Sequence, residues 1–221
     1  MGDTDWGYLG PLLQKALGET AYMVSLALLV AGVVGLALGI GLYTARRGGL
    51  LSNRGVFGVL NVLINLIRPI PFIIFVTAIG PLTLKVIGKT IGTDAAIFPM
   101  AIMASVAFAR LVEQNLVALD PGVVEAARAM GASRWRIIWS VLIPEALGPL
   151  ILAFTFLVIA VIDMSAMVGM IGGGGLGDFA IRHGYQRFNW EVTLVAVAII
   201  VVVVQGVQLL GNWLARRALR R

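Results

Sequence analysis

The sequence predicts an all-α polytopic membrane protein, and three observations support this fold class. The chain of 221 residues is 59% hydrophobic and only 13% charged, whereas about 25% of the residues in an average soluble domain are charged. Its mean hydropathy is +0.96, and several apolar stretches reach the roughly 20 residues that a helix needs to cross a bilayer core. These stretches are continuous rather than alternating, which argues against a transmembrane β-barrel.

The positions of these stretches predict five membrane-spanning helices. They cover about Thr20–Tyr43, Val56–Leu84, Ala95–Val112, Ala146–Met170 and Trp190–Leu214. The second span is interrupted by Pro69 and Pro71, and a broken helix is tolerated in a membrane where it lines a cavity or is covered by protein. We expect a structural role for Arg68, Pro69 and Pro71, with a simple kink and Arg68 extended to the headgroups as the alternative.

Small residues in the first span predict close packing against a neighbouring helix. Gly35 and Gly39 form a G-x-x-x-G pattern, which lets two backbones approach in a membrane. Because small residues are also common in membrane helices that pack loosely, the pattern alone leaves this open.

The distribution of the 17 basic residues predicts the orientation of the chain. One side of the membrane would hold Arg46, Arg47, Arg54, Arg110, Arg128, Arg134, Arg136, Arg216, Arg217, Arg220 and Arg221. The other side would hold Lys15, Lys85, Lys89, Arg182 and Arg187, and Arg68 is left over near a membrane face or within a span. Because Lys and Arg accumulate in cytoplasmic loops, we expect an N-terminal segment, residues 1–18, outside the cell. A transmembrane domain of residues 19–212 and a basic cytoplasmic tail of residues 213–221 would follow, without a cleavable signal peptide.

A polar segment between the third and fourth spans has the pattern of a short capped helix. Asp120 is a favourable capping residue before Pro121, which suits the first helical position. Gly131 is placed where a helix ends, Ser133 can cap the next segment, and Pro144 would break or kink the chain before the fourth span. On pattern alone, this segment is either an amphipathic helix lying on lipid or a contact for a soluble partner.

The spacing of residues within this segment favours a contact for a soluble partner over a helix lying on lipid. Glu125-Ala126-Ala127 is followed after three residues by Gly131 and, nine residues later, by Val141-Leu142-Ile143-Pro144. This pattern resembles the signature of the permease subunits of bacterial ABC importers. The resemblance implies a coupling helix that sits in a cleft of a cytoplasmic ATPase subunit. It assigns ATPase coupling to Glu125, Ala126, Ala127, Arg128, Met130, Gly131 and Pro144.

Three further segments are similar to the methionine importer permeases within that family. They are Arg68-Pro69-Ile70-Pro71-Phe72, Ser165-Ala166-Met167 and Gly174-Gly175-Leu176-Gly177. The resemblance runs from about Glu19 to the C-terminus and implies the type I ABC importer permease fold, with structural roles for Gly174, Gly175 and Gly177. It implies an amino-acid permease, most similar to those for methionine, in the inner membrane of a bacterial cell. The expected partners are two ATP-binding subunits, a second copy of the chain, an extracytoplasmic solute-binding protein and membrane lipid.

An acidic residue inside the fourth span is the candidate for the translocation path. A carboxylate at the centre of a bilayer costs about 2.5–3.5 kcal/mol on insertion scales, so Asp163 should face a polar cavity or a partner helix. Together with Ser165 and Met167 it is assigned to the path. The main alternative function is an ion-coupled secondary transporter in which Asp163 carries the coupling charge.

Other chemistry is disfavoured by the composition. The chain has no cysteine and one histidine, which gives no basis for a metal site, a cofactor or an intramembrane enzyme. Gly88-Lys89-Thr90 resembles the end of a phosphate-binding loop, but position 83 is Thr rather than Gly, so ATP hydrolysis is expected in a partner subunit. A net charge of +6 is attributed to membrane orientation rather than to nucleic-acid binding.

Overall fold

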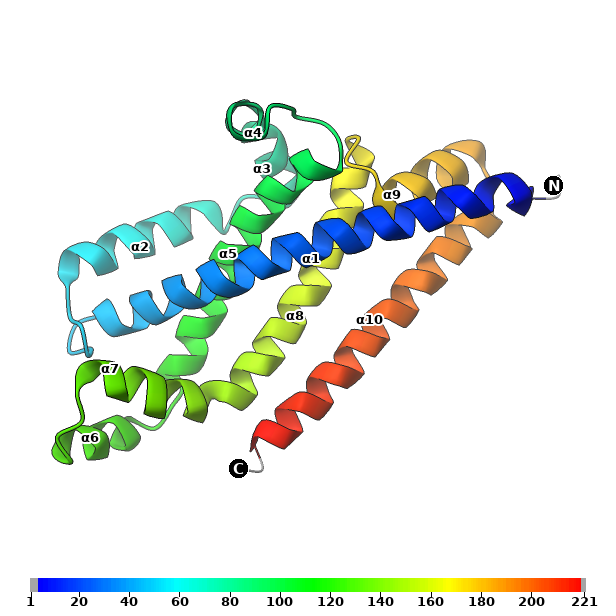
Figure 1. The fold of residues 1–221 in the computed structure, drawn as a ribbon. Helices are drawn as coiled ribbons and strands as arrows, with labels where there is room; N and C mark the ends of the chain where they lie inside the picture. The colour runs from blue at the N-terminus through cyan, green and yellow to red at the C-terminus, as the bar shows by residue number, and fades with distance from the viewer. Residues whose placement is uncertain (1–3, 220–221) are drawn as a thin grey trace. The chain divides into compact units, whose positions relative to one another are not determined.

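A computed structural model describes residues 4–219, and every regular element within this range is a helix. Figure 1 follows the chain from α1 in blue to α10 in red. Among these residues, four helical runs are long and apolar enough to cross a membrane: α1 (Trp6–Ala45), α5 (Thr93–Val117), Arg134–Met170 and α10 (Trp190–Leu219). A fifth crossing is present if the broken pair α2 (Arg54–Ile67) and α3 (Phe72–Ala78) counts as one span. The prediction of an all-α membrane protein is confirmed.

The remaining elements are the parts of the run Arg134–Met170, namely α7 (Arg134–Ile137), η1 (Ile138–Leu142) and the long α8 (Ile143–Met170), together with several short helices. The short helices are α4 (Gly80–Ile87), α6 (Pro121–Ala129), α9 (Gly175–Phe179), η2 (Ala180–Gly184) and η3 (Tyr185–Arg187). Two long helical runs extend further than the predicted spans, because α1 begins at Trp6 and the fourth run begins at Arg134.

The predicted second span is divided into separate helices. α2 begins after Asn53, whose side-chain oxygen accepts hydrogen bonds from the backbone N–H groups of Gly55 at 3.0 Å and Val56 at 3.1 Å. The helix ends at Ile67, immediately before the prolines. Since proline lacks an N–H group and restricts the residue before it, Pro69 and Pro71 prevent α2 from continuing into α3. Arg68, Pro69 and Pro71 are all exposed at this break.

The described residues form two compact units, and α1, α5, α8 and α10 each contribute to both. Unit 1 comprises residues 4–30, 70–104 and 158–207, and unit 2 comprises residues 31–69, 105–157 and 208–219. Unit 1 has a core of buried residues from α1, α9 and α10: Leu9, Ala16, Leu176, Phe179, Val192 and Ala196. Near this core, the Trp6 indole N–H donates to the Glu191 carboxylate at 2.9 Å.

Unit 2 is held together by close packing of α1, α2 and α5. Its core contains Leu42, Ile64, Val106 and Ala109. A methyl group placed on Gly35 would lie 2.8 Å from the Ser105 carbonyl oxygen, and one on Gly39 would lie 2.6 Å from that of Ala109. The two glycines therefore bring α1 against the backbone of α5, and the close packing predicted from G-x-x-x-G is confirmed.

Candidate functional site

The polar segment of unit 2 folds as the predicted short helix. The Asp120 carboxylate accepts a hydrogen bond from the Gly122 N–H at 2.8 Å, and α6 begins at Pro121. Gly131 has φ +77°, a left-handed conformation that glycine adopts without strain. The Ala132 N–H donates back to the Ala127 carbonyl at 3.1 Å, which satisfies a carbonyl group at the end of the helix. The expected cap at Asp120 and the helix end before Gly131 are both confirmed.

The side chains of α6 divide between an anchoring position and an outer face. Ala127 is only 3% exposed and is the buried residue of the helix. Glu125, Ala126, Arg128 and Met130 are exposed, and the Met130 side chain is 81% exposed. Because a nine-residue helix is too short to be stable alone in water, its contacts with α7 and η1 must hold it. The outer face is left without a covering element among the described residues of the chain.

Of the break or kink predicted at Pro144, the structure excludes the break. The Ser133 hydroxyl accepts a hydrogen bond from the Arg136 N–H at 3.3 Å and caps α7 as predicted. The chain then continues as helix through a π-helical turn, η1, rather than breaking before Pro144. A proline ring crowds the carbonyl four residues earlier, and the extra residue of a π turn relieves that crowding. The helical run from α7 to α8 is therefore continuous.

Aromatic side chains lie on the exposed side of this segment. Trp135 is 62% exposed and Trp139 is 63% exposed, whereas Ile137, Ile138 and Leu142 are buried. The buried residues hold η1 in unit 2. The two tryptophans are suited to a membrane interface or to a partner surface.

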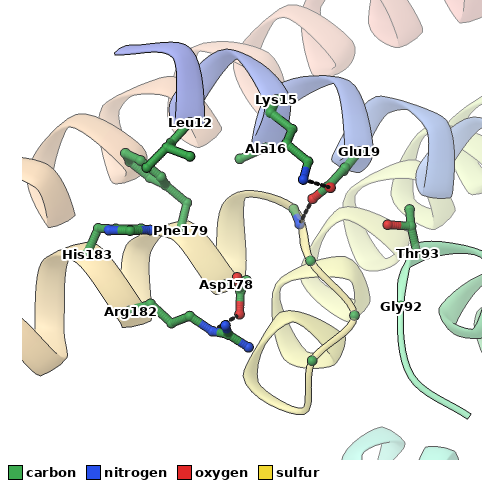
Figure 2. A pocket seen from close by; sticks show the side chains of 14 residues that line it. Leu12, Lys15, Ala16, Glu19, Gly92, Thr93, Asp178, Phe179, Arg182 and His183 are labelled. Atoms are coloured by element: carbon green, nitrogen blue, oxygen red, sulfur yellow. Dashed lines mark hydrogen bonds and ion pairs between the residues drawn. The ribbon is translucent and has the colours of Figure 1, made fainter. Parts of the chain in front are cut away.

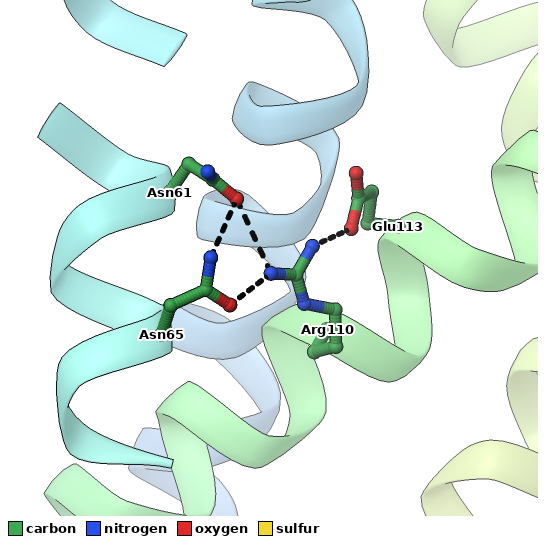
Figure 3. Close-up of polar contacts among 4 residues, drawn as sticks. All are labelled: Asn61, Asn65, Arg110 and Glu113. Atoms are coloured by element: carbon green, nitrogen blue, oxygen red, sulfur yellow. Dashed lines mark hydrogen bonds and ion pairs between the residues drawn. The ribbon is translucent and has the colours of Figure 1, made fainter. Parts of the chain in front are cut away.

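A polar network between α2 and α5 was missed by the sequence analysis (Figure 3). The Arg110 guanidinium donates to Glu113 at 2.5 Å and to the Asn61 side-chain oxygen at 3.2 Å, and it also donates to Asn65. The side chains of Arg110 and Glu113 are only 16% and 14% exposed. The available signal was an arginine three residues before a glutamate inside an apolar helix, because buried charges in membrane helices need partners. The network joins the two helices in unit 2.

In unit 1, a glycine-rich loop connects α8 to α9. Gly174 and Gly175 have φ +79° and +78°, so a side chain at either position would be strained. The Gly175 N–H donates to the Glu19 carboxylate at 2.8 Å, and the Leu176 N–H donates to the Thr20 hydroxyl at 2.8 Å. Gly177 packs against the backbone of Ala166 with no room for a methyl group. This geometry explains why glycines suit these positions.

A cleft of about 290 Å³ lies beside this loop (Figure 2). Lys15 and Glu19 reach it from α1, 3.7 Å apart. Asp178 and Arg182 reach it from α9 and η2, 2.6 Å apart. Each carboxylate has its own cation, so the cleft has no unpaired charge of either sign from these four side chains.

His183 lines the same cleft, with its ring 5.4 Å from that of Phe179. Burial lowers the pKa of His183, and the positive charges of Arg187 and Arg182 act in the same direction. Asp178 opposes the change by raising the pKa. No group of three or more potential metal ligands occurs in residues 4–219, and His183 is not part of one.

The three candidate path residues of α8 have different environments. Asp163 is exposed on the surface of the isolated chain, and Met167 is half-buried. Ser165 is 3% exposed, and its hydroxyl donates to the Ile162 carbonyl at 2.6 Å. The structure thus places Asp163 and Met167 on an accessible side of α8 and Ser165 inside unit 1.

Comparison with known proteins identifies the family. The family model of binding-protein-dependent transport system inner membrane components matches residues 37–220. The chain belongs to this family. It is therefore a transport component of the inner membrane rather than an enzyme.

Individual permeases of the family are similar over nearly the whole chain. A probable D-methionine transport system permease protein, MetI, of Vibrio cholerae is 41% identical over 93% of this chain and 92% of its own length. A protein of the same description in Pasteurella multocida is 43% identical over 90% of this chain and 92% of its own length. A chain of the MetNI methionine ABC transporter, solved in inward-facing conformations, superposes with a TM-score of 0.91 at 34% identity, covering 98% of this chain and 99% of that one.

Proposed function

We propose that this chain is the permease subunit of an ABC importer that carries methionine across the inner membrane. The named substrates of its relatives support this assignment. Within the chain, the geometry of α6 is the observation that carries it. A short helix is fixed at both ends and anchored by Ala127, and its exposed residues include Glu125, Ala126 and Arg128, which are assigned to ATPase coupling.

The contacts of α6 suggest how movement would be transmitted. α6 packs against α7 and η1, and η1 continues into α8 as one helical run that ends at Met170. Because a capped helix and a continuous helical run deform little, a push on α6 displaces the start of α8 rather than being absorbed in a loop. In this proposal, ATP binding closes two ATPase subunits, α6 moves with them, and the path opens outward; release after hydrolysis turns the path inward.

The assembly that we propose has further parts. Two copies of the chain form the path, two ATPase subunits bind the α6 surfaces, and a solute-binding protein delivers substrate from outside. The basic residues support an N-terminus outside and a C-terminus in the cytoplasm. The outward-facing apolar residues of α10, such as Val202 at 71% exposure, suit contact with lipid. Asp163 and Met167 are proposed to face the path, and Gly174, Gly175 and Gly177 to shape the adjoining loop.

The first test is capture of the ATPase by the tagged chain in mild detergent, with Ala126→Trp as the variant. Ala126 is exposed, so the indole does not disturb the interior of the chain but obstructs the outer face of α6. We expect a stoichiometric ATPase with the wild type and its loss with Ala126→Trp. Ala198→Trp, which adds the same side chain at an exposed position of α10, is the control and should retain the ATPase.

Two outcomes would contradict the proposal. One is normal capture and normal transport by Ala126→Trp. The other is transport of methionine by the chain alone in liposomes under an ion gradient, which would support the secondary transporter instead and would make Asp163→Asn the next variant.

A further inference from the structure

Asp163 is an exposed carboxylate within the apolar helix α8. Among residues 4–219, Asp163 has neither an ion pair nor a hydrogen bond from another side chain, although it is exposed on α8. Three cations of unit 1 already have carboxylate partners: Lys15 with Glu19, Lys89 with Asp94 and Arg182 with Asp178. None of the basic side chains in the described residues forms an ion pair with Asp163, which leaves its carboxylate available to a group outside this chain.

The fourth span predicted from the sequence, about Ala146–Met170, places Asp163 within the bilayer. It lies seven residues before Met170, the last residue of α8, which is about 10 Å along the axis at 1.5 Å per residue. The side chain of aspartate is too short to reach the headgroups from that depth, unlike that of lysine or arginine. Intramembrane carboxylates accordingly face a polar cavity, a partner or a transported group.

The residues around Asp163 make one side of α8 chemically mixed. Met167 and Met170 follow at four and seven residues, positions that share a face in an α-helix. Met167 is half-buried and Met170 is 64% exposed. This face thus combines a single carboxylate with two flexible, polarizable thioether side chains, which adapt to an apolar group of varied shape.

Helix α8 of a second copy contains no lysine or arginine that could pair with Asp163. If the assembly is a symmetric pair, each copy presents the same surface, and α8 of the partner offers another aspartate rather than a basic residue. A cationic group that passes along the path during transport would pair with the Asp163 carboxylate and then leave it, as a conduction pathway requires.

We propose that Asp163 binds the α-ammonium group of the amino acid during its passage, while Met167 and Met170 contact its apolar side chain. This inference rests on the proposed function, because it assumes that the substrate is an amino acid. It makes Asp163 a specificity-determining residue for the amino group and assigns no role to it in recognising the carboxylate.

The experiment measures binding to the purified permease–ATPase complex in nanodiscs, without the solute-binding protein, by calorimetric titration. Three probes separate the charges: L-methionine, L-methionine methyl ester, which keeps only the ammonium group, and 4-(methylthio)butanoate, which keeps only the carboxylate. We expect Asp163→Asn to weaken binding of the first two by about tenfold to a hundredfold, as for the loss of one charged hydrogen bond. Binding of 4-(methylthio)butanoate should be weak and unchanged.

Two variants control this experiment. Asp163→Glu keeps the charge and should recover most of the affinity for the ammonium probes. Asp94→Asn removes an exposed carboxylate that pairs with Lys89 and should bind all three probes as the wild type does. ATPase capture by Asp163→Asn shows that the variant is folded.

Several results would overturn the inference. They are wild-type affinity of Asp163→Asn for methionine, an equal loss for all three probes, or no binding of either ammonium probe to the wild-type complex. Uptake of labelled methionine by the full complex with its binding protein tests the function separately. If the wild type takes up no methionine the proposed function fails, whereas normal uptake by both wild type and Asp163→Asn refutes only the role of Asp163.

Discussion

Replacing Gly39 by alanine should destabilise unit 2 although alanine is the better helix former. The new methyl carbon would lie 2.5 Å from the Val112 Cβ and 2.6 Å from the Ala109 carbonyl oxygen. Ordinary van der Waals contact begins at 3.4 Å, so the shortfall at Val112 is 3.4 − 2.5 = 0.9 Å. The obstructing atoms belong to the backbone and to a branched Cβ, which cannot swing away as the end of a long side chain can.

The expected magnitude combines two opposing effects. Overpacking a tightly packed core costs about 1–3 kcal/mol, and replacing glycine by alanine inside a helix recovers about 0.5–1 kcal/mol. We expect a net loss of about 1–2 kcal/mol in the free energy of unfolding for Gly39→Ala. In soluble proteins of this size, that corresponds to a decrease of about 2–8 °C in Tm.

The assay is unfolding of the purified complex in detergent, followed by heat and by titration with a denaturing detergent. Gly58→Ala is the matched control, because Gly58 lies in α2 of the same unit and a methyl group there meets nothing within 4 Å. It should be neutral or slightly stabilising. A Gly39→Ala variant as stable as Gly58→Ala would refute the argument that α1 and α5 are in backbone contact.

Two further predictions concern charge. Arg110→Ala leaves Glu113 with an uncompensated, largely buried charge and should cost about 3–5 kcal/mol; in a double-mutant cycle measured by denaturant titration, Arg110→Ala/Glu113→Ala should lose less than the sum of the single changes, and strict additivity would contradict the coupling. The pKa of His183 is lowered, so its contribution to stability is fully present above the unfolded value of about 6.5 and is lost as pH falls toward the folded value. Thermal unfolding at pH 7.5 and 5.5 should therefore show a smaller acid destabilisation in His183→Gln than in the wild type, and equal pH dependence would count against this account.

Local sequence signals predicted those helices and helix ends that depend only on neighbouring residues. Hydropathy over 20 residues predicted the apolar helices, because each must satisfy its backbone hydrogen bonds internally to exist in lipid. Asp120 and Gly131 predicted the two ends of α6, since capping involves only neighbouring atoms. The break that Pro144 allowed did not occur, because the preceding turn widened into a π turn.

The residues that act across helices could be recognised only in the folded chain. The sequence contains Asn61, Asn65, Arg110 and Glu113, but their convergence depends on the rotation of α2 relative to α5, which no periodicity specifies. The division of α6 into a buried Ala127 and an exposed Ala126 likewise depends on what α7 and η1 cover.

The sequence by itself determined the class, the family resemblance and the limits of α6, because composition, periodicity and capping are properties of neighbouring residues. The tertiary structure decided which charges have partners. Among residues 4–219 it left Asp163 without a side-chain partner and brought Asn61 and Asn65 to Arg110, because such partnerships depend on contacts between residues that are distant along the chain.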